Sequence, residues 1–288
     1  MANYVIYTDS ACDLSPALLA EWGVPFQSLT FRFDGDETEY ANNDMTAGDF
    51  YTQMRAGGIA KTAAVNSETF RKAFMNILKE GKDVLYLGFS SGLSTTYNSA
   101  RLAAEELRGQ FPDRKVITID TLAASAGEGL LVHLALEKQK SGATIEETAA
   151  YIEDMKLKIS IWFTVDDLVY LKRGGRVSPT VAFVGNVLGI KPILHMDEAG
   201  HLVNVSKVRG RKTAVATLAE KYGELAATRG EGPVYISHGD CQKDAEELAA
   251  ILKEKYGADV QIITDVGPVI GSHSGPGTLA LFFVGTAR

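Results

Sequence analysis

The sequence predicts an α/β fold with two domains, and three observations support this prediction. Short apolar runs alternate with segments of helical periodicity from the first residues onward. Capping residues and glycines punctuate these segments. The pattern changes near residue 158, because four strand–helix units precede it and a hairpin pattern follows it. We expect a three-layer α/β/α domain with a parallel sheet over residues 1–158, and an α/β domain with a mixed sheet over residues 159–288.

Composition excludes several classes of protein. With 288 residues, of which 45% are apolar, the chain can bury a core in two ordinary domains. A formal net charge of -7 argues against non-specific binding of nucleic acid, which requires a basic surface. The two cysteines, Cys12 and Cys241, lie far apart and lack the spacing of zinc ligands. We therefore expect no nucleic-acid partner, no disulfide, no metal and no cofactor.

The N-terminus enters a strand-like segment at once, without a basic region followed by a long apolar stretch. No window holds the ~18 uninterrupted apolar residues that a membrane-spanning helix needs. We expect a cytoplasmic protein without an integral membrane segment.

In the first domain, a strand over residues 4–8 leads through an acidic loop to Ser15 and Pro16, which favour the start of a helix. The acidic loop contains Asp9, Ser10 and Asp13, and we interpret these oxygens as caps because no further acidic ligand accompanies them.

The remaining elements of this domain follow in order. A strand is expected over residues 24–33, a helix from Thr46 to the glycines at 57 and 58, a polar connection over 61–67, a helix over 68–79, a strand over 83–88, a strand over 115–120, and helices over 122–140 and 144–158.

The strand over residues 83–88 gives way to a loop that is rich in hydroxyl groups and leads into a helix. Five hydroxyls stand within seven residues, at Ser90, Ser91, Ser94, Thr95 and Thr96. Any one of them is explained by capping. A helix N-terminus at the carboxyl end of a parallel strand also favours anions such as a carboxylate. We predict that this loop binds the ligand.

The second domain is expected to contain a strand over 160–165, a short helix through 170, a loop over 171–179, an apolar helix over 181–188, a hairpin of strands 190–196 and 202–208, a helix over 209–229, a strand–helix–strand unit over 234–237, 243–256 and 260–264, a glycine-rich loop over 267–277 and a strand over 279–284. His273 stands among glycines and hydroxyls in that loop, so we treat it as a candidate ligand-binding or catalytic residue.

Several motifs, in this order, make the chain resemble the DegV family. They are TDSACDL at 8–14, KT at 61–62, SSGLSTTYNSA at 90–100, LKRGGRVS at 171–178, VRGRKTA at 208–214 and GPVIGSHSGPG at 267–277. They span nearly the whole chain. The resemblance implies a two-domain protein that holds a long-chain fatty acid, such as palmitate, in a tunnel between the domains.

The resemblance also implies roles for individual residues. Thr62 and Ser94 match family positions that contact the fatty-acid carboxylate, and Arg173 and His273 match positions near this head group. The chain departs from the family pattern after Thr62, where Gln and Pro are missing, and at Thr95, where the family has Gly. Both hydroxyls remain.

The resemblance further implies that the protein is not itself an enzyme but the carrier subunit of a fatty acid kinase. A separate dihydroxyacetone-kinase-like subunit would phosphorylate the carboxylate, and this chain has no GxxxxGK[ST] loop of its own. We expect a basic rim of Arg173, Arg176, Arg209 and Arg211 to dock that partner.

Two alternatives stay open. The sequence GFSSG at 88–92 fits the nucleophile elbow of an α/β-hydrolase, which would make Ser90 the nucleophile of an esterase, with His273 and either Asp240 or Asp265 completing a triad. A lipid sensor without a kinase is the other alternative, because fold alone does not establish coupling to a partner.

Overall fold

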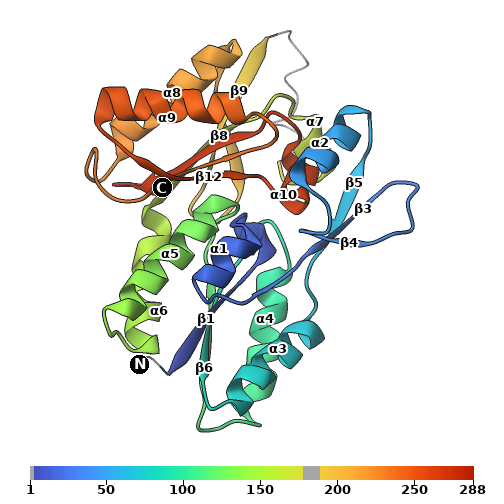
Figure 1. The fold of residues 1–288 in the computed structure, drawn as a ribbon, viewed down its shortest axis with the longest axis vertical. Helices are drawn as coiled ribbons and strands as arrows, with labels where there is room; N and C mark the ends of the chain where they lie inside the picture. The colour runs from blue at the N-terminus through green and yellow to red at the C-terminus, as the bar shows by residue number, and fades with distance from the viewer. Residues whose placement is uncertain (1–2, 178–188) are drawn as a thin grey trace.

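Three sheets organise the computed structural model, which describes residues 3–177 and 189–288 (Figure 1). The described chain contains a four-stranded parallel sheet in its first half, a six-stranded mixed sheet in its second half and a small antiparallel sheet. These sheets confirm the predicted α/β class. The boundary after residue 158 stays a prediction.

The parallel sheet has the order β2-β1-β6-β7 and lies between two layers of helices. Its strands are β1 (Tyr4–Asp9), β2 (Phe26–Gln27), β6 (Asp83–Gly88) and β7 (Val116–Asp120). The helices of this half are α1 (Pro16–Glu21), α3 (Ser67–Lys79), α4 (Thr96–Arg108), α5 (Ala126–Lys140) and α6 (Ile145–Met155). The pair α3 and α4 covers one face, and α5 and α6 cover the other. Strand β6 is buried on both faces, as a central parallel strand requires.

The mixed sheet has the order β10-β9-β8-β13-β11-β12, in which only β11 and β12 run parallel to each other. Its strands are β8 (Ile159–Thr164), β9 (Ile190–Met196), β10 (Leu202–Arg209), β11 (Val234–His238), β12 (Val260–Asp265) and β13 (Leu279–Val284). Two helices, α8 (Arg211–Leu225) and α9 (Gln242–Tyr256), cover one face.

Helix α5 lies between the two large sheets, because it contacts β1 and β6 of the parallel sheet and β8, β11 and β13 of the mixed sheet. The side chains of β11 point alternately into two hydrophobic cores, one on each face of the mixed sheet. Val234 and Ile236 join the core beneath α8 and α9, whereas Tyr235 packs in the core that includes α5. Residues of β11 at the same parity as Tyr235, such as Ser237, therefore face the first half of the chain.

Residues 30–63 form a small unit that packs against the second half. Strand β3 (Thr30–Phe33) pairs with β4 (Tyr40–Ala41) and β5 (Ala60–Ala63), and α2 (Ala47–Arg55) completes the unit. The prediction of one strand over residues 24–33 was wrong. Only Phe26 and Gln27 pair with β1, because Phe31 and Phe33 bury their rings against Phe50 instead. This unit contacts α10 (Pro268–Ser274).

Three further expectations need correction. Residues 60–63 form β5 rather than part of a polar connection, because they pair with β3. Helix α5 starts at Ala126 rather than at 122, since Leu122 and Ser125 have positive φ angles that a helix cannot accommodate. The glycine-rich stretch over 267–277 contains α10, whose first residue is Pro268. The apolar helix predicted over 181–188, with Ser178 and Pro179 before it, lies outside the described residues.

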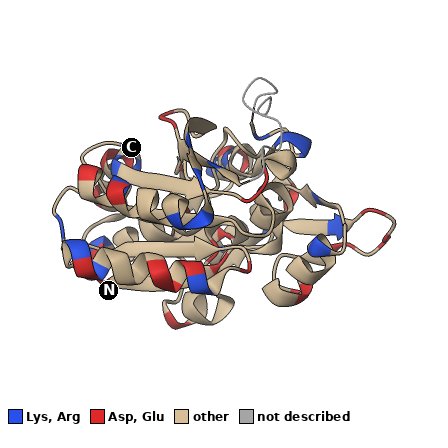
Figure 2. Ribbon diagram, turned by 90° about the horizontal axis from the view of Figure 1, so that it is seen from above, with Lys and Arg blue, Asp and Glu red and all other residues tan. Residues whose placement is uncertain are grey.

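Charged residues of both signs are interspersed along the outer helices (Figure 2). Glu128 is an exception, because its side chain is fully buried on α5. Its Oε1 lies 2.8 Å from Thr8 Oγ1, which also lies 3.0 Å from the carbonyl oxygen of Leu87. The threonine has one proton for two acceptors. A protonated Glu128 resolves the conflict by donating to Thr8, and burial raises the pKa of Glu128 well above its ordinary value.

We predict that Glu128→Gln makes the free energy of unfolding less dependent on pH. The folded wild type holds a proton that the unfolded chain loses above about pH 4.3, so wild-type stability should fall as the pH rises. Urea unfolding at about pH 5 and about pH 8 checks this. Relative to the wild type, the variant should gain about 1.4 kcal/mol for each pH unit over which only the folded wild type keeps the proton. If the variant and the wild type differed in free energy of unfolding by the same amount at both pH values, Glu128 would not be neutral in the folded protein.

Candidate functional site

A cavity of about 490 Å³ lies between the two halves of the chain, within the range of about 300–1,000 Å³ that is typical of small-molecule sites. The first half contributes the end of β5 and the loops that precede α4 and α5, and the second half contributes the mixed sheet and α10. Much of the lining is apolar, including Ile161, Phe163, Leu171, Met196, Ala280 and Phe282. The cavity therefore suits a ligand with a large hydrocarbon part.

The polar candidates Thr62, Ser94 and His273 all line this cavity. Thr62 Oγ1 lies 2.8 Å from His273 Nε2, so a hydrogen bond joins β5 to α10 across 211 positions of sequence. Arg176 also lines the cavity, and its Nε donates to the carbonyl oxygen of Leu93 at 3.1 Å. Because Leu93 adjoins Ser94, the arginine holds the hydroxyl loop at the cavity, and its charge acts on His273.

His273 is held neutral by its surroundings. Burial lowers its pKa to about 4, and the nearby charge of Arg176 acts in the same direction. The Nδ1 atom is buried without a hydrogen-bond partner among the described residues. It packs so closely on Gly174 that a β-carbon there would lie 2.1 Å from it. A neutral ring that donates from Nε2 to Thr62 leaves the threonine proton free for a ligand.

The hydrogen bonds of Ser94 can be assigned in the same way. Its Oγ accepts from the backbone N–H of Thr96 at 3.2 Å and lies 2.9 Å from Thr96 Oγ1. If Thr96 donates that second bond, the Ser94 proton points to the ligand. The loop thus presents a hydroxyl donor at the start of α4, where the helix dipole favours an anion.

The four candidate arginines occupy different surroundings. Arg176 is half-buried at the cavity, and burial lowers its pKa. Arg173 does not line the cavity, and its exposed guanidinium lies over the ring of Tyr170. Arg209 is exposed on β10. Arg211 is ion-paired with Asp244 at 2.8 Å and lies 3.7 Å from Asp166. The geometry therefore places Arg176, rather than Arg173, beside the polar end of the cavity.

A second polar part of the cavity wall comes from Ser125 and Ser237, whose Oγ atoms lie 2.9 Å apart. Ser125 also donates to Asp13 Oδ2 at 2.5 Å. Asp13 is buried, and burial, with the nearby charges of Asp265 and Asp9, raises its pKa to about 7. Sequence reasoning assigned no ligand role to these serines. Their approach depends on two halves of the chain meeting, so no local signal marked them.

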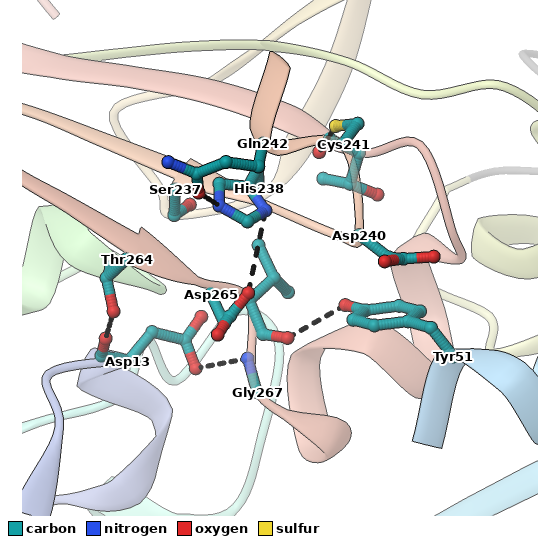
Figure 3. Close-up of polar contacts among 12 residues, drawn as sticks. Asp13, Tyr51, Ser237, His238, Asp240, Cys241, Gln242, Thr264, Asp265 and Gly267 are labelled. Carbon is teal, nitrogen blue, oxygen red and sulfur yellow. Dashed lines mark hydrogen bonds and ion pairs between the residues drawn. The ribbon is translucent and has the colours of Figure 1, made fainter. Parts of the chain in front are cut away.

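Asp13 also anchors the loop that leads into α10 (Figure 3). Its Oδ1 accepts from the N–H of Gly267 at 3.0 Å, and its carbonyl oxygen accepts from Thr264 Oγ1 at 2.8 Å. Tyr51 of α2 donates to the carbonyl oxygen of Val266 at 2.8 Å. Asn42 accepts from the N–H of Val269 at 2.8 Å. The first half of the chain thereby positions the helix that carries His273.

Ser90 of the hydrolase hypothesis is fully buried and does not line the cavity. Its Oγ donates to the carbonyl oxygen of Gly200 at 2.9 Å. Gly200 has a φ of +77°, and a β-carbon at this residue would lie 2.1 Å from the Ser90 Oγ. The proposed base, His273, bonds Thr62 instead. Asp265 lies 3.6 Å from His238, and Asp240 pairs with Arg55. The described contacts do not assemble these residues into a triad.

Within the described chain, no group of three or more His, Cys, Asp or Glu side chains is arranged to hold a metal ion. Asp9 caps a short 3-10 helix by accepting from the N–H of Ala11 at 3.0 Å, and Ser10 accepts from the N–H of Leu29. Cys12 and Cys241 are both free thiols. None of the described helices combines the length and the apolar character needed to cross a membrane.

Comparisons with known proteins agree with the motifs. The model of a family described as "Uncharacterised protein, DegV family" matches residues 3–286. A DegV domain-containing protein of Clostridium perfringens is 42% identical and aligns over 100% of this chain and 99% of its own length. A crystal structure of a DegV lipid-binding protein from Thermotoga maritima has a TM-score of 0.87 at 32% identity, with 100% of both chains covered.

A solved structure that describes fatty acid binding by a DegV family protein from Thermus thermophilus is also similar to this chain. Its TM-score is 0.88 at 29% identity, and the match covers 97% of this chain and 98% of that chain.

We predict that His273 stays neutral between about pH 5.5 and about pH 8, because its pKa lies near 4. The unfolded chain would protonate it near its ordinary pKa of ~6.5, so this residue should reduce stability as the pH falls from about 6.5 to about 4. NMR titration of the ring protons, assigned with His273→Asn, measures the pKa. Arg176→Met should raise it. A transition near pH ~6.5 in the wild type would contradict this account.

Proposed function

The chain belongs to the DegV family, and from that premise we propose that it binds a long-chain fatty acid in the cavity between its halves. In this proposal the protein is a carrier that presents the carboxylate to a separate fatty acid kinase subunit. One observation carries it. An apolar cavity meets two hydroxyl groups, Thr62 and Ser94, with the neutral ring of His273 and the cation of Arg176 beside them.

The head group would be held by donors that are already oriented. If His273 Nε2 donates to Thr62 and Thr96 Oγ1 donates to Ser94, both hydroxyl protons remain available for a carboxylate. Burying a carboxylate without partners costs several kcal/mol, whereas each hydrogen bond to a charged group returns about 1.5 to 3 kcal/mol. Arg176 supplies the opposite charge at half-buried depth.

The hydrocarbon chain supplies the main driving force. A sixteen-carbon acid buries about 15 CH2 or CH3 groups, which at ~0.8 kcal/mol each contribute roughly 12 kcal/mol. Association costs about 4 to 15 kcal/mol, so a preformed cavity and a satisfied head group decide whether binding is tight.

We predict that Thr62→Ala and Ser94→Ala each weaken binding of palmitate by about 10- to 100-fold, because each removes one hydrogen bond to a charged group. Isothermal titration after removal of lipid measures the affinity, and mass spectrometry of an organic extract identifies what the purified protein retains. Thr217→Ala is the matched control, since this threonine is partly exposed on α8, lies outside the cavity lining and bonds its own helix. Unchanged affinity in both cavity variants would refute the proposed head-group site.

The carrier would need no nucleophile, because phosphoryl transfer relies on positioning, metal ions and cations that the kinase subunit brings. The exposed cations of the basic rim are the proposed docking groups. Arg173 precedes Gly174, which packs on His273, and Arg209 is exposed on β10. Arg211 contributes less in this proposal because Asp244 and Asp166 already offset its charge. Arg176 has a double role, at the head group and at the rim.

We predict that the double variant Arg173→Glu and Arg209→Glu forms acyl phosphate at least ~10-fold more slowly with a dihydroxyacetone-kinase-like subunit, while palmitate binding stays within about twofold of the wild type. The cause is the loss of charge complementarity at the docking surface. Lys79→Glu, which reverses an exposed charge on α3, should leave the rate unchanged. An unaffected double variant would remove these arginines from docking. Absence of acyl phosphate with the wild type would favour a lipid sensor.

The esterase alternative receives no comparable support. A nucleophile elbow exposes its serine to substrate, whereas Ser90 is fully buried and uses its proton to bond Gly200. The geometry favours a role for Ser90 in joining the hydroxyl loop to the β9–β10 turn.

A further inference from the structure

We propose that Ser125 and Ser237 form a second polar contact in the cavity, which accepts a hydrogen bond from a hydroxyl group on the ligand's hydrocarbon chain. The ligand class would then include monohydroxylated long-chain fatty acids. This inference rests on the proposed function, because it assumes that the cavity holds a fatty acid.

The two serines come from different halves of the chain and both line the cavity. Ser125 immediately precedes α5, and Ser237 lies on β11. Ser237 is fully buried and pairs in register with Ala280, which in turn pairs with Phe163. On the β13 side its neighbours across the sheet are therefore apolar cavity residues, and on the other side it pairs with Thr264 of β12. A hydroxyl-bearing residue thus lines a part of the cavity wall that otherwise suits hydrocarbon.

The hydrogen bonds of this group can be counted proton by proton. Asp13 Oδ1 accepts from the N–H of Gly267, and Oδ2 accepts the only hydroxyl proton of Ser125. Ser125 must therefore act as the acceptor in its 2.9 Å contact with Ser237. The proton of Ser237 is used in that bond. Its oxygen keeps lone-pair capacity for which the described residues provide no donor.

This count sets the chemistry that the site would recognise. With Asp13 ionised, Ser237 offers the cavity an acceptor and no proton. A ligand hydroxyl can donate to it, whereas a ketone has only lone pairs to offer and cannot. A plain hydrocarbon chain leaves the Ser237 oxygen facing CH2 groups. The site therefore favours a hydroxylated chain over both an oxo chain and an unsubstituted one.

The position of Ser125 is fixed by its backbone conformation and by its hydrogen bonds. Ser125 has φ 54° and ψ -148°, a conformation that residues other than glycine rarely adopt. The bond from its N–H to the carbonyl oxygen of Ala11 and the bond from its hydroxyl to Asp13 retain it there. Asp13 is fixed in turn by Thr264 and Gly267 (Figure 3).

A positional series of monohydroxypalmitic acids tests the proposal against palmitate. The measurements belong at about pH 8.5, where Asp13 is ionised, since burial raises its pKa to about 7. We expect at least one hydroxyl position to bind about tenfold more tightly than palmitate, and the oxo acid with the same position to gain nothing. If no position exceeds palmitate, the inference is wrong.

Ser237→Ala provides the decisive variant, because it removes the acceptor without adding volume. It should abolish the preference for the hydroxy acid and keep palmitate binding within about threefold of the wild type. A preference that persists in this variant would overturn the assignment. If palmitate itself fails to bind to the wild type, the proposed function fails, which is a different outcome from binding without any preference.

A second variant reverses the direction of the hydrogen bonds. In Asp13→Asn, the amide oxygen can still accept from Gly267, while the amide nitrogen donates to Ser125. Ser125 then donates to Ser237, whose proton becomes available to the ligand. The oxo acid should gain affinity relative to the hydroxy acid by about three- to tenfold. An unchanged ratio of the two affinities would contradict the proton count.

Discussion

The attachment of α10 to the first half of the chain is the constraint on which the rest of the structure depends. Hydrogen bonds from Asp13, Asn42 and Tyr51 hold the backbone just before and at the start of this helix. The Thr62–His273 bond holds its far end. The cavity exists because two separately formed layers meet there, and a shift of α10 would displace a head-group residue and part of the wall together.

Burial and hydrogen bonding fix the position of the proton on several groups, one in the cavity wall and others in the core of the first half. His273 is neutral because it is buried beside Arg176, and Glu128 is neutral because Thr8 cannot donate to both of its acceptors. Asp13 satisfies both carboxylate oxygens with donors from different elements. In a low-dielectric space each such choice has a large effect, because an unpaired polar group is costly and a satisfied one fixes its neighbours. The same logic decides which hydroxyls can serve a ligand.

Local sequence patterns predicted much of this architecture. The parallel sheet, the helices that cover it and the β9–β10 hairpin follow from apolar periodicity and capping residues such as Thr46 and Thr144. The residues of the small sheet were misread, because the alternation of Phe31 and Phe33 fits any sheet and does not name its partner strand. The glycines around His273 concealed α10, whose stability comes from contacts with α2, β3 and β5 rather than from its own sequence.

The sequence by itself determined the α/β class, the family, and the presence of Thr62, Ser94 and His273 as polar candidates, because these depend on local order along the chain. Only the tertiary structure decided which of the arginines reaches the cavity. It also decided that Ser90 donates its proton to the carbonyl oxygen of Gly200, and that the hydroxyl groups of Ser125 and Ser237 come into contact. The reason is physical. Burial, proximity and the direction of a hydrogen bond arise here between segments that lie 83 to 112 positions apart, and short-range patterns carry no information about such contacts.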